Sequence, residues 1–240
     1  MGQPAVIAQL RSRIPAIEGV GQRHASVPFG IDALDGWLPG SGLATGALHE
    51  VAGSPELCDD AAATIFLAGI LARIDGPVFW CLRWRDLFAP ALDLAGLAPD
   101  RVIHVEAGSD VNVLLAMEEC LRHAGVVGEV AKLSTTASKR LQLVAEGSGV
   151  PAFVFRSAAP IEGTGEGTAA MTRWRVLAAP SIPLGIPSLG RPRWDVQLER
   201  VRGGEPRSWI MEACDAQGRL ALPAQLVDRP AAAEERRRAS

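Results

Sequence analysis

The stretch "LHEVAGSPELCDDAAATIFLAGILAR", residues 48–73, decides the fold because a short glycine-led turn joins an apolar run to an amphipathic one. We expect a strand over 47–52 and a helix over 57–73. This is where a phosphate-binding loop would sit, opening at Gly53 and closing on Gly-Lys-Thr. The three closing positions here are Cys58, Asp59 and Asp60. The stretch predicts a nucleotide-binding architecture in which the residues that would contact phosphate are acidic.

Composition indicates one large globular domain. The chain has 240 residues, of which 48% are hydrophobic and 21% charged, so it can bury a full core. Its net charge of −3 gives no overall attraction for nucleic acid, and any DNA contact would need a local basic strip. Composition therefore neither requires nor forbids DNA binding.

Cysteine, histidine and apolar spacing predict no metal, no cofactor and no membrane segment. The four cysteines form no CxxC pair, and the four histidines lie at unrelated spacings, so we expect reduced thiols and structural histidines. No segment reaches the ~18 apolar residues of a membrane span, and the first residues lack a signal core. We expect a cytoplasmic protein.

Short apolar runs alternate with helical patterns after the first helix. We expect strands over 77–82, 101–106, 126–133 and 151–156, of which the first two read as buried on both faces. A helix from 110 has apolar positions 111, 114, 115 and 121, assigned to one face. The alternation predicts an α/β fold with a doubly wound, mostly parallel sheet and helices on both faces.

The pattern changes at Gly163, where a Gly/Thr loop precedes three segments of alternating polarity. We expect these to be antiparallel strands added to one edge of the sheet. The predicted organisation is an N-terminal helical arm over 1–26, a core over 27–222 and a flexible C-terminal tail over 223–240.

The order of elements resembles the RecA-like recombinase core and, within it, the ImuA family of accessory proteins of the bacterial translesion-synthesis mutasome. Three segments carry the resemblance: "FGIDALDGWLPGSGLATGALHEVAG", "VFWCLRWRDLFAPALDLAGLAPDRVIHVEA" and "TASKRLQLVAEGSGVPAFVFR". It covers roughly residues 27–215. The second segment is the most family-specific, through Trp80, Arg83, Leu87, Phe88, Pro90 and Gly96.

Set against an active ATPase of that fold, the resemblance implies a degenerate site. Gly53 is kept, but Cys58, Asp59 and Asp60 replace glycine, lysine and threonine. Two unit charges about 4 Å apart repel by roughly 4 kcal/mol at an effective dielectric near 20, so two carboxylates oppose a triphosphate. The resemblance also puts Arg83 at the water-activating glutamate position and Leu133 at the Walker B aspartate position. We expect a pseudo-ATPase that does not bind ATP in the usual mode.

Three functions remain in competition. The resemblance implies a non-catalytic adaptor of SOS-induced translesion synthesis that binds a Y-family-polymerase-like subunit and an error-prone C-family DNA polymerase, with RecA a further candidate partner. A divergent RecA-like or KaiC-like ATPase would need Lys132 or Lys139 as a substitute. A SulA-type cell-division inhibitor is the third, and the chain length disfavours it.

The sequence offers two candidate contact regions. One is a set of arginines in the C-terminal strands, and the other is the N-terminal arm. Arginines stand beside tryptophans in "MTRWRVLAAP" and "LGRPRWDVQLER", which suits phosphate contact and base stacking, directly or through partners. The stronger interpretation places the tryptophans in the core and the arginines in water. Residues 5–14 are a candidate self-association helix. The candidate contacts to DNA or partners are Arg173, Arg175, Arg191, Arg193, Arg202 and Arg207.

Overall fold

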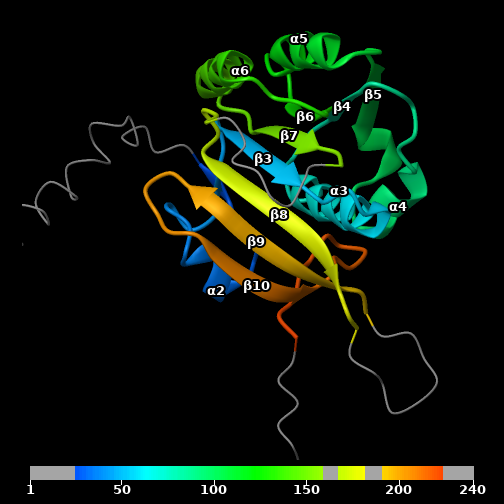
Figure 1. The fold of residues 1–240 in the computed structure, drawn as a ribbon, viewed down its shortest axis with the longest axis vertical. Helices are drawn as coiled ribbons and strands as arrows, with labels where there is room; N and C mark the ends of the chain where they lie inside the picture. The colour runs from blue at the N-terminus through cyan, green and yellow to red at the C-terminus, as the bar shows by residue number, and fades with distance from the viewer. Residues whose placement is uncertain (1–24, 159–166, 182–190, 224–240) are drawn as a thin grey trace, which may run out of the picture.

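The computed structural model describes residues 25–158, 167–181 and 191–223, which form a twisted eight-stranded sheet covered by helices (Figure 1). The strand order is β10-β9-β8-β3-β7-β6-β4-β5. Its strands are β3 Leu48–Ala52, β4 Val78–Leu82, β5 Val102–Glu106, β6 Gly125–Val130, β7 Ala152–Arg156, β8 Thr172–Ala179, β9 Arg193–Val201 and β10 Arg207–Glu212. The helices are α2 Asp32–Asp35, α3 Leu57–Leu71, α4 Ala89–Leu94, α5 Asp110–Cys120 and α6 Thr135–Ser148, with a 3-10 turn at Pro99–Arg101.

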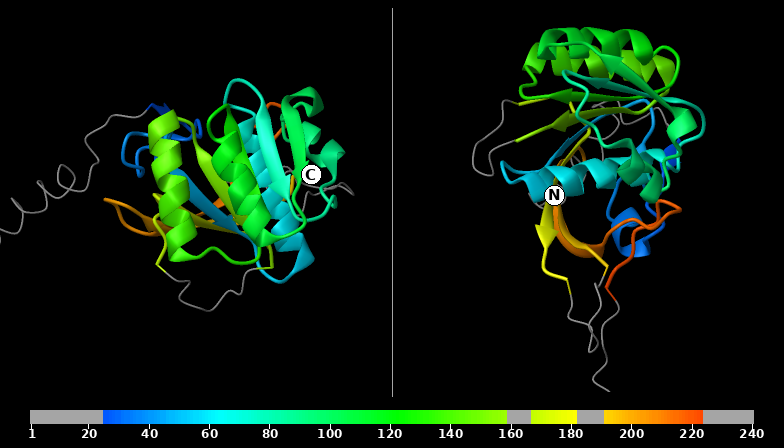
Figure 2. Two further views of the ribbon diagram at one scale, coloured as in Figure 1. Left: turned by 90° about the horizontal axis from the view of Figure 1, so that it is seen from above. Right: turned by 90° about the vertical axis from the view of Figure 1, so that its right-hand side faces the viewer.

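Strands β3 to β7 are all parallel, and β3 lies near the middle of the sheet. The prediction of an α/β, doubly wound, mostly parallel sheet is confirmed. Helices α5 and α6 begin at serine caps, where Ser109 and Ser134 accept hydrogen bonds from backbone N–H groups. They cover one face of the sheet, and α3 and α4 lie on the other (Figure 2).

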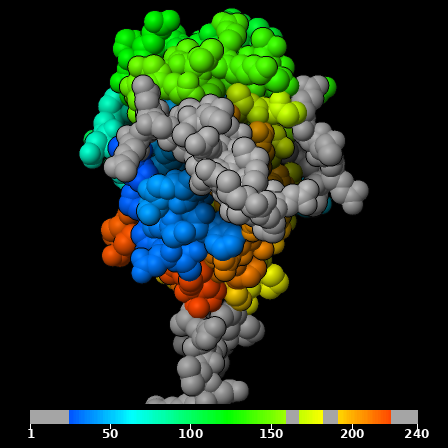
Figure 3. All heavy atoms as spheres, turned by 90° about the vertical axis from the view of Figure 1, so that its left-hand side faces the viewer, coloured from blue at the N-terminus to red at the C-terminus, as the bar shows by residue number. Residues whose placement is uncertain are grey.

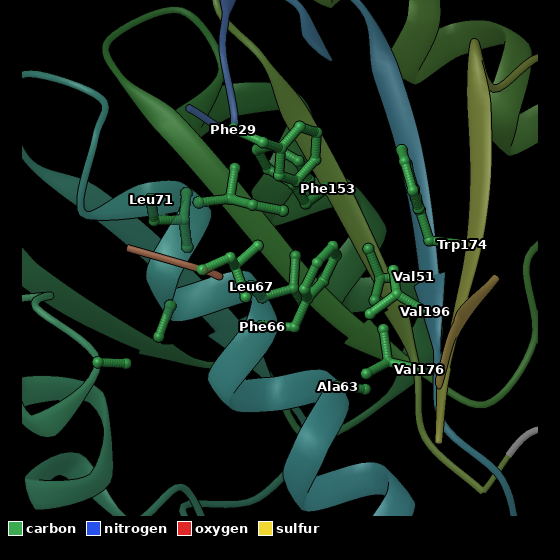
Figure 4. Close-up of a cluster of buried hydrophobic side chains, with 14 of the residues drawn as sticks. Phe29, Val51, Ala63, Phe66, Leu67, Leu71, Phe153, Trp174, Val176 and Val196 are labelled. Carbon is green, nitrogen blue, oxygen red and sulfur yellow. The ribbon is translucent and has the colours of Figure 1, made fainter. Parts of the chain in front are cut away.

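Helix α3 is enclosed between the parallel strands and the C-terminal strands, which curl beneath it (Figure 2). Its buried side chains therefore point in several directions, as expected of an apolar helix at the centre of a core. Figure 4 shows Phe66 of α3 beside Val51 of β3, with Trp174 of β8 further along the same cluster. Phe66 and Trp174 have ring centroids 6.0 Å apart. At Gly69 a Cβ would collide with the Cys214 side chain, so glycine lets the C-terminal segment approach.

Residues 25–46 pack against the side of this core. Strands β1 Ser26–Val27 and β2 Leu43–Ala44 pair to form a small antiparallel ribbon, and α2 lies in the segment of chain that connects them. The buried Asp35 side chain accepts hydrogen bonds from the backbone N–H groups of three preceding residues, 29 to 31. Figure 3 shows this segment (blue) between the layer of α5 and α6 (green) and the C-terminal strands (orange).

Two predictions about buried faces are wrong. Strand β5 is the sheet edge, with β4 as its neighbour on one side, and Ile103 is 44% exposed. In α5 two of the four predicted positions are wrong, because Val111 and Leu115 are exposed; the other two, Leu114 and Leu121, do pack toward the sheet, together with Val113 and Met117. The apolar spacing of α5 fits two faces equally well, and the position of the sheet decides between them.

The C-terminal strands are confirmed as an addition to one edge, but the expectation that all three are antiparallel is wrong for the first. Strands β9 and β10 are antiparallel to their neighbours, but β8 runs parallel to β3 and antiparallel to β9. Most of the arm, the Gly/Thr loop up to 166 and the tail from 224 lie outside the described residues, so the helical arm, loop and tail stay predictions. No helix in the described ranges is both long and apolar enough to cross a membrane.

Candidate functional site at the carboxyl edge of the parallel strands

The turn between β3 and α3 is closed by its own side chains. The Ser54 hydroxyl donates to Asp59 Oδ2 at 2.5 Å and accepts from the Glu56 backbone N–H at 3.1 Å. A Cβ on Gly53 would lie 2.5 Å from Asp60 Oδ1 and 2.6 Å from the Asp60 backbone nitrogen. The first turn of α3 thus packs directly on Gly53. The carboxylates of Asp59 and Asp60 therefore lie against the turn itself.

The same turn is fastened to β8. Asp59 is 8% exposed, and its Oδ1 accepts a hydrogen bond from the Ala178 backbone N–H at 2.7 Å. The buried Arg175 donates to the Gly53 carbonyl at 2.8 Å and forms an ion pair with Glu199 at 2.5 Å. Asp59, at the lysine position of an ATP-binding loop, therefore serves as an internal hydrogen-bond acceptor.

On the other side of the α3 start, three carboxylates lie close together. The pKa of Glu129 on β6 is raised to about 7, by burial first and then by the carboxylates of Asp86 and Asp60, while Arg83 and a hydrogen bond with Ser157 partly oppose them. The pKa of Asp60 is also raised, by burial first and by Asp59, against a hydrogen bond from the Ala158 N–H at 2.7 Å. These groups make the region unfavourable for more negative charge.

Arg83 follows β4 at this edge, where the sequence placed it. Its Nε lies 3.5 Å from Asp110 Oδ1, and its Nη2 donates to the Ser157 hydroxyl at 3.3 Å. The guanidinium thus links the ends of β4 and β7 to the start of α5. A cation stands where the resemblance expects a water-activating carboxylate.

Leu133 is not part of this site. It lies three residues beyond β6, 7% exposed, in the apolar cluster under α5 and α6. The acidic residue that β6 contributes is Glu129, which the sequence reading missed because it searched the Walker B strand for an aspartate. The signal was present, since a lone glutamate within the apolar run "GVVGEV" is unusual in a central strand.

The two lysines considered as substitutes do not reach the closed turn. Lys139 is exposed on α6, and α6 covers the face of the sheet opposite α3. Lys132 is exposed beyond the end of β6, where its backbone N–H bonds to Asp110. Within the described ranges no group of three or more histidine, cysteine or acidic residues has a geometry that could hold a metal ion.

The arginines of β8 are internal. Arg173 forms an ion pair with the buried Glu50 at 3.2 Å, and Arg175 is 6% exposed. The interpretation that arginines of this strand face water is wrong for both, because each pairs with a glutamate inside the fold. The tryptophan part of that interpretation is confirmed, since Trp174 and Trp194 are buried.

The remaining candidate arginines do not form one strip. Arg191 pairs with Glu212 at 3.1 Å, and Arg193 donates to the Pro180 carbonyl, both at one end of β9. At the other end Arg202 donates to the Ala169 carbonyl, and Arg207 stacks on Trp37 with 4.2 Å to the ring centroid. The structure separates the two groups by the length of the strand, roughly 25 Å for eight residues.

Comparison with known proteins places this chain in a family. No family model matches it. The curated Protein ImuA of Caulobacter vibrioides, recorded for two strains, is 37% identical over 229 residues, covering 86% of this chain and 92% of the relative. The chain belongs to the ImuA family. The crystal structure of the RadB recombinase aligns with a TM-score of 0.55 and 16% identity, over 80% of this chain and 97% of RadB. This likeness supports the RecA-like fold and nothing beyond it.

Proposed function

We propose that this ImuA-family protein is a non-catalytic, RecA-like adaptor of SOS-induced translesion DNA synthesis in the cytoplasm. Its partners are a Y-family-polymerase-like mutasome subunit and an error-prone C-family DNA polymerase, with RecA as a further candidate. Membership of the ImuA family and the RecA-like fold support the accessory role.

One observation carries the non-catalytic part of the proposal, namely the Asp59 side chain closing the turn that would hold phosphate. Asp59 is bonded to Ser54 on one oxygen and to β8 on the other. Turning it outward would leave a hydroxyl and a backbone N–H unpaired, at about 1–3 kcal/mol each. The altered positions Cys58 and Arg83 add to this, so a divergent ATPase is disfavoured. A SulA-type inhibitor is disfavoured by the likeness to Protein ImuA over 86% of the chain.

The partner contacts proposed here lie on the exposed arginines of the C-terminal strands, Arg191 and Arg207, and on the tail over 223–240. The N-terminal arm is proposed as a self-association element, and DNA is reached directly or through partners. Arg173 and Arg175 are left out because their internal ion pairs occupy them.

Co-purification tests the adaptor role. The full chain and a chain ending at Leu222 are each co-expressed with the polymerase-like subunit, and binding is measured by titration calorimetry. We expect the full chain to bind and the shortened chain to bind more weakly. Mg-ATP should give neither a thermal shift nor hydrolysis. If the chain does not bind the subunit but binds single-stranded DNA tightly and with a strong salt dependence, the adaptor role is wrong and the protein is a DNA-binding module.

A further inference from the structure

The loop between β4 and α4 presents two aromatic side chains to solvent. Trp84 is 60% exposed and Phe88 is 69% exposed, whereas Trp80, four residues earlier on β4, is fully buried. A hydrogen bond from the Asp86 N–H to the Trp84 carbonyl at 3.0 Å forms a tight turn within this loop. Exposed apolar groups gathered at one place mark contact surfaces more often than chance exposure does.

The aromatic loop adjoins the carboxylates of the site. Asp86 lies between Trp84 and Phe88 in the sequence, and its charge acts on Glu129. Asp60 acts on Glu129 from the start of α3. We call the surface formed by Asp60, Trp84, Asp86, Phe88 and Glu129 the acidic aromatic edge.

The charges of the acidic aromatic edge are not balanced within the described residues. Arg83 is the cation that acts on Glu129, but its guanidinium also serves Asp110 and Ser157. Asp60 Oδ1 is buried and accepts no hydrogen bond from any residue that the structure describes. A buried carboxylate oxygen without a donor costs stability, so the described residues leave negative charge at this edge without a partner.

We propose that the acidic aromatic edge docks a segment of a protein partner in which an arginine or lysine stands beside apolar residues. The inference rests on the adaptor function proposed above and assigns a place to one of its contacts. The cation complements Asp86 and Glu129, and apolar neighbours cover Trp84 and Phe88, whose ring faces also attract cations. A phosphate-bearing ligand is repelled by the same carboxylates.

The test measures binding of the polymerase-like subunit to full-length variants by calorimetry. In the first variant, Trp84→Ala with Phe88→Ala removes the aromatic groups, and in the second Asp86→Lys reverses a charge. We expect each to weaken binding at least tenfold. The matched control, Val111→Ala with Leu115→Ala on α5, removes an equally exposed apolar pair elsewhere and should leave affinity unchanged. Because all these side chains are exposed, the variants should fold normally.

A second readout follows Glu129 itself. An NMR titration of its carboxylate should give a lower pKa in the complex than in the free chain, because a cation has come close. If the wild-type chain binds the subunit and the Trp84/Phe88 and Asp86 variants bind as tightly, this inference is wrong while the adaptor function stands. If wild type does not bind the subunit at all, both are wrong. Loss of oligonucleotide binding alone in these variants would also overturn the proposal, by making the surface a nucleic-acid contact.

Discussion

The two sides of the α3 start differ in how their polar groups are satisfied. On the β8 side, Asp59 accepts two hydrogen bonds and Arg175 pairs with Glu199, so the groups are buried and matched. On the β4 and β6 side, Asp60 and Glu129 both have raised pKa values, chiefly because burial disfavours their charged forms. On the first side the charged groups are paired within the fold. On the second side the carboxylates leave negative charge that we propose a partner balances.

This contrast shows that carboxylates on the two sides of one turn can differ in how far the fold satisfies them. Asp59 joins the start of α3 to β8 through the Ala178 N–H, a stabilising role that constrains this residue. The neighbouring carboxylates do not stabilise the fold in the same way. Substitutions on the two sides should therefore have opposite effects on the free energy of unfolding.

The largest effect is expected from Asp59→Lys, which restores the lysine of an ATP-binding loop. The substitution buries an ammonium without an acceptor and leaves the Ser54 hydroxyl and Ala178 N–H unpaired, so it should cost about 3–5 kcal/mol in urea unfolding. Asp59→Asn, which keeps one acceptor oxygen, should cost only about 1–2 kcal/mol. A stable Asp59→Lys variant that binds ATP would break the comparison.

Arg175→Met should cost about 2–4 kcal/mol, because it leaves Glu199 without its partner and the Gly53 carbonyl without its donor. Adding Glu199→Gln should recover part of this loss, since the uncompensated charge is then gone. The interaction energy from the double-mutant cycle is the measurement. If the double variant loses as much free energy of unfolding as Arg175→Met alone, the ion pair contributes little beyond packing.

Glu129→Gln should stabilise the protein at alkaline pH. The Glu129 pKa rises from 4.5 to about 7 on folding, so the native state binds more protons between these values and wild-type stability falls as pH rises through this window. After allowance for solvent screening, the gain at pH 8.5 should be on the order of 2 kcal/mol and near zero at pH 4.5. Unfolding at both pH values checks this, with the exposed Glu106→Gln as control. Identical unfolding curves for Glu129→Gln and wild type at pH 8.5 would contradict this prediction.

The smallest effect is expected from Trp84→Ala. Its ring is mostly exposed, so unfolding should change by less than about 0.5 kcal/mol, whereas Trp80→Ala in the core should cost about 3–5 kcal/mol. Thermal unfolding of both variants measures the difference. A large loss from Trp84→Ala would show that the aromatic loop supports the fold rather than a contact.

The sequence predicted the parallel sheet, the added C-terminal strands and the turn between β3 and α3, because local periodicity and the order of elements determine them. It did not predict which face of α5 is buried, because Val111 and Val113 have similar hydrophobicity and only the neighbouring sheet distinguishes them. It assigned β5 to the interior because an apolar edge strand and an apolar central strand have the same composition.

The roles of individual charged residues in the site were harder to predict. The Arg173–Glu50 and Arg175–Glu199 pairs join residues 123 and 24 positions apart, and no local pattern indicates such partners. Asp59 was expected to repel phosphate, but its hydrogen bond to Ala178 spans 119 positions and gives it a structural role. Glu129 was missed because a motif defined by aspartate was applied to its strand.

The enclosure of α3 has a consequence for how the chain folds during synthesis. The helix is complete by residue 71, but one of its apolar sides is covered by β8 and β9, which begin at 172 and 193. Until those strands leave the ribosome, Phe66 and its neighbours stay uncovered, and contacts of such high sequence separation form slowly. We therefore expect the apolar helix at residues 57–71 to stay exposed on the nascent chain until both strands have been synthesised.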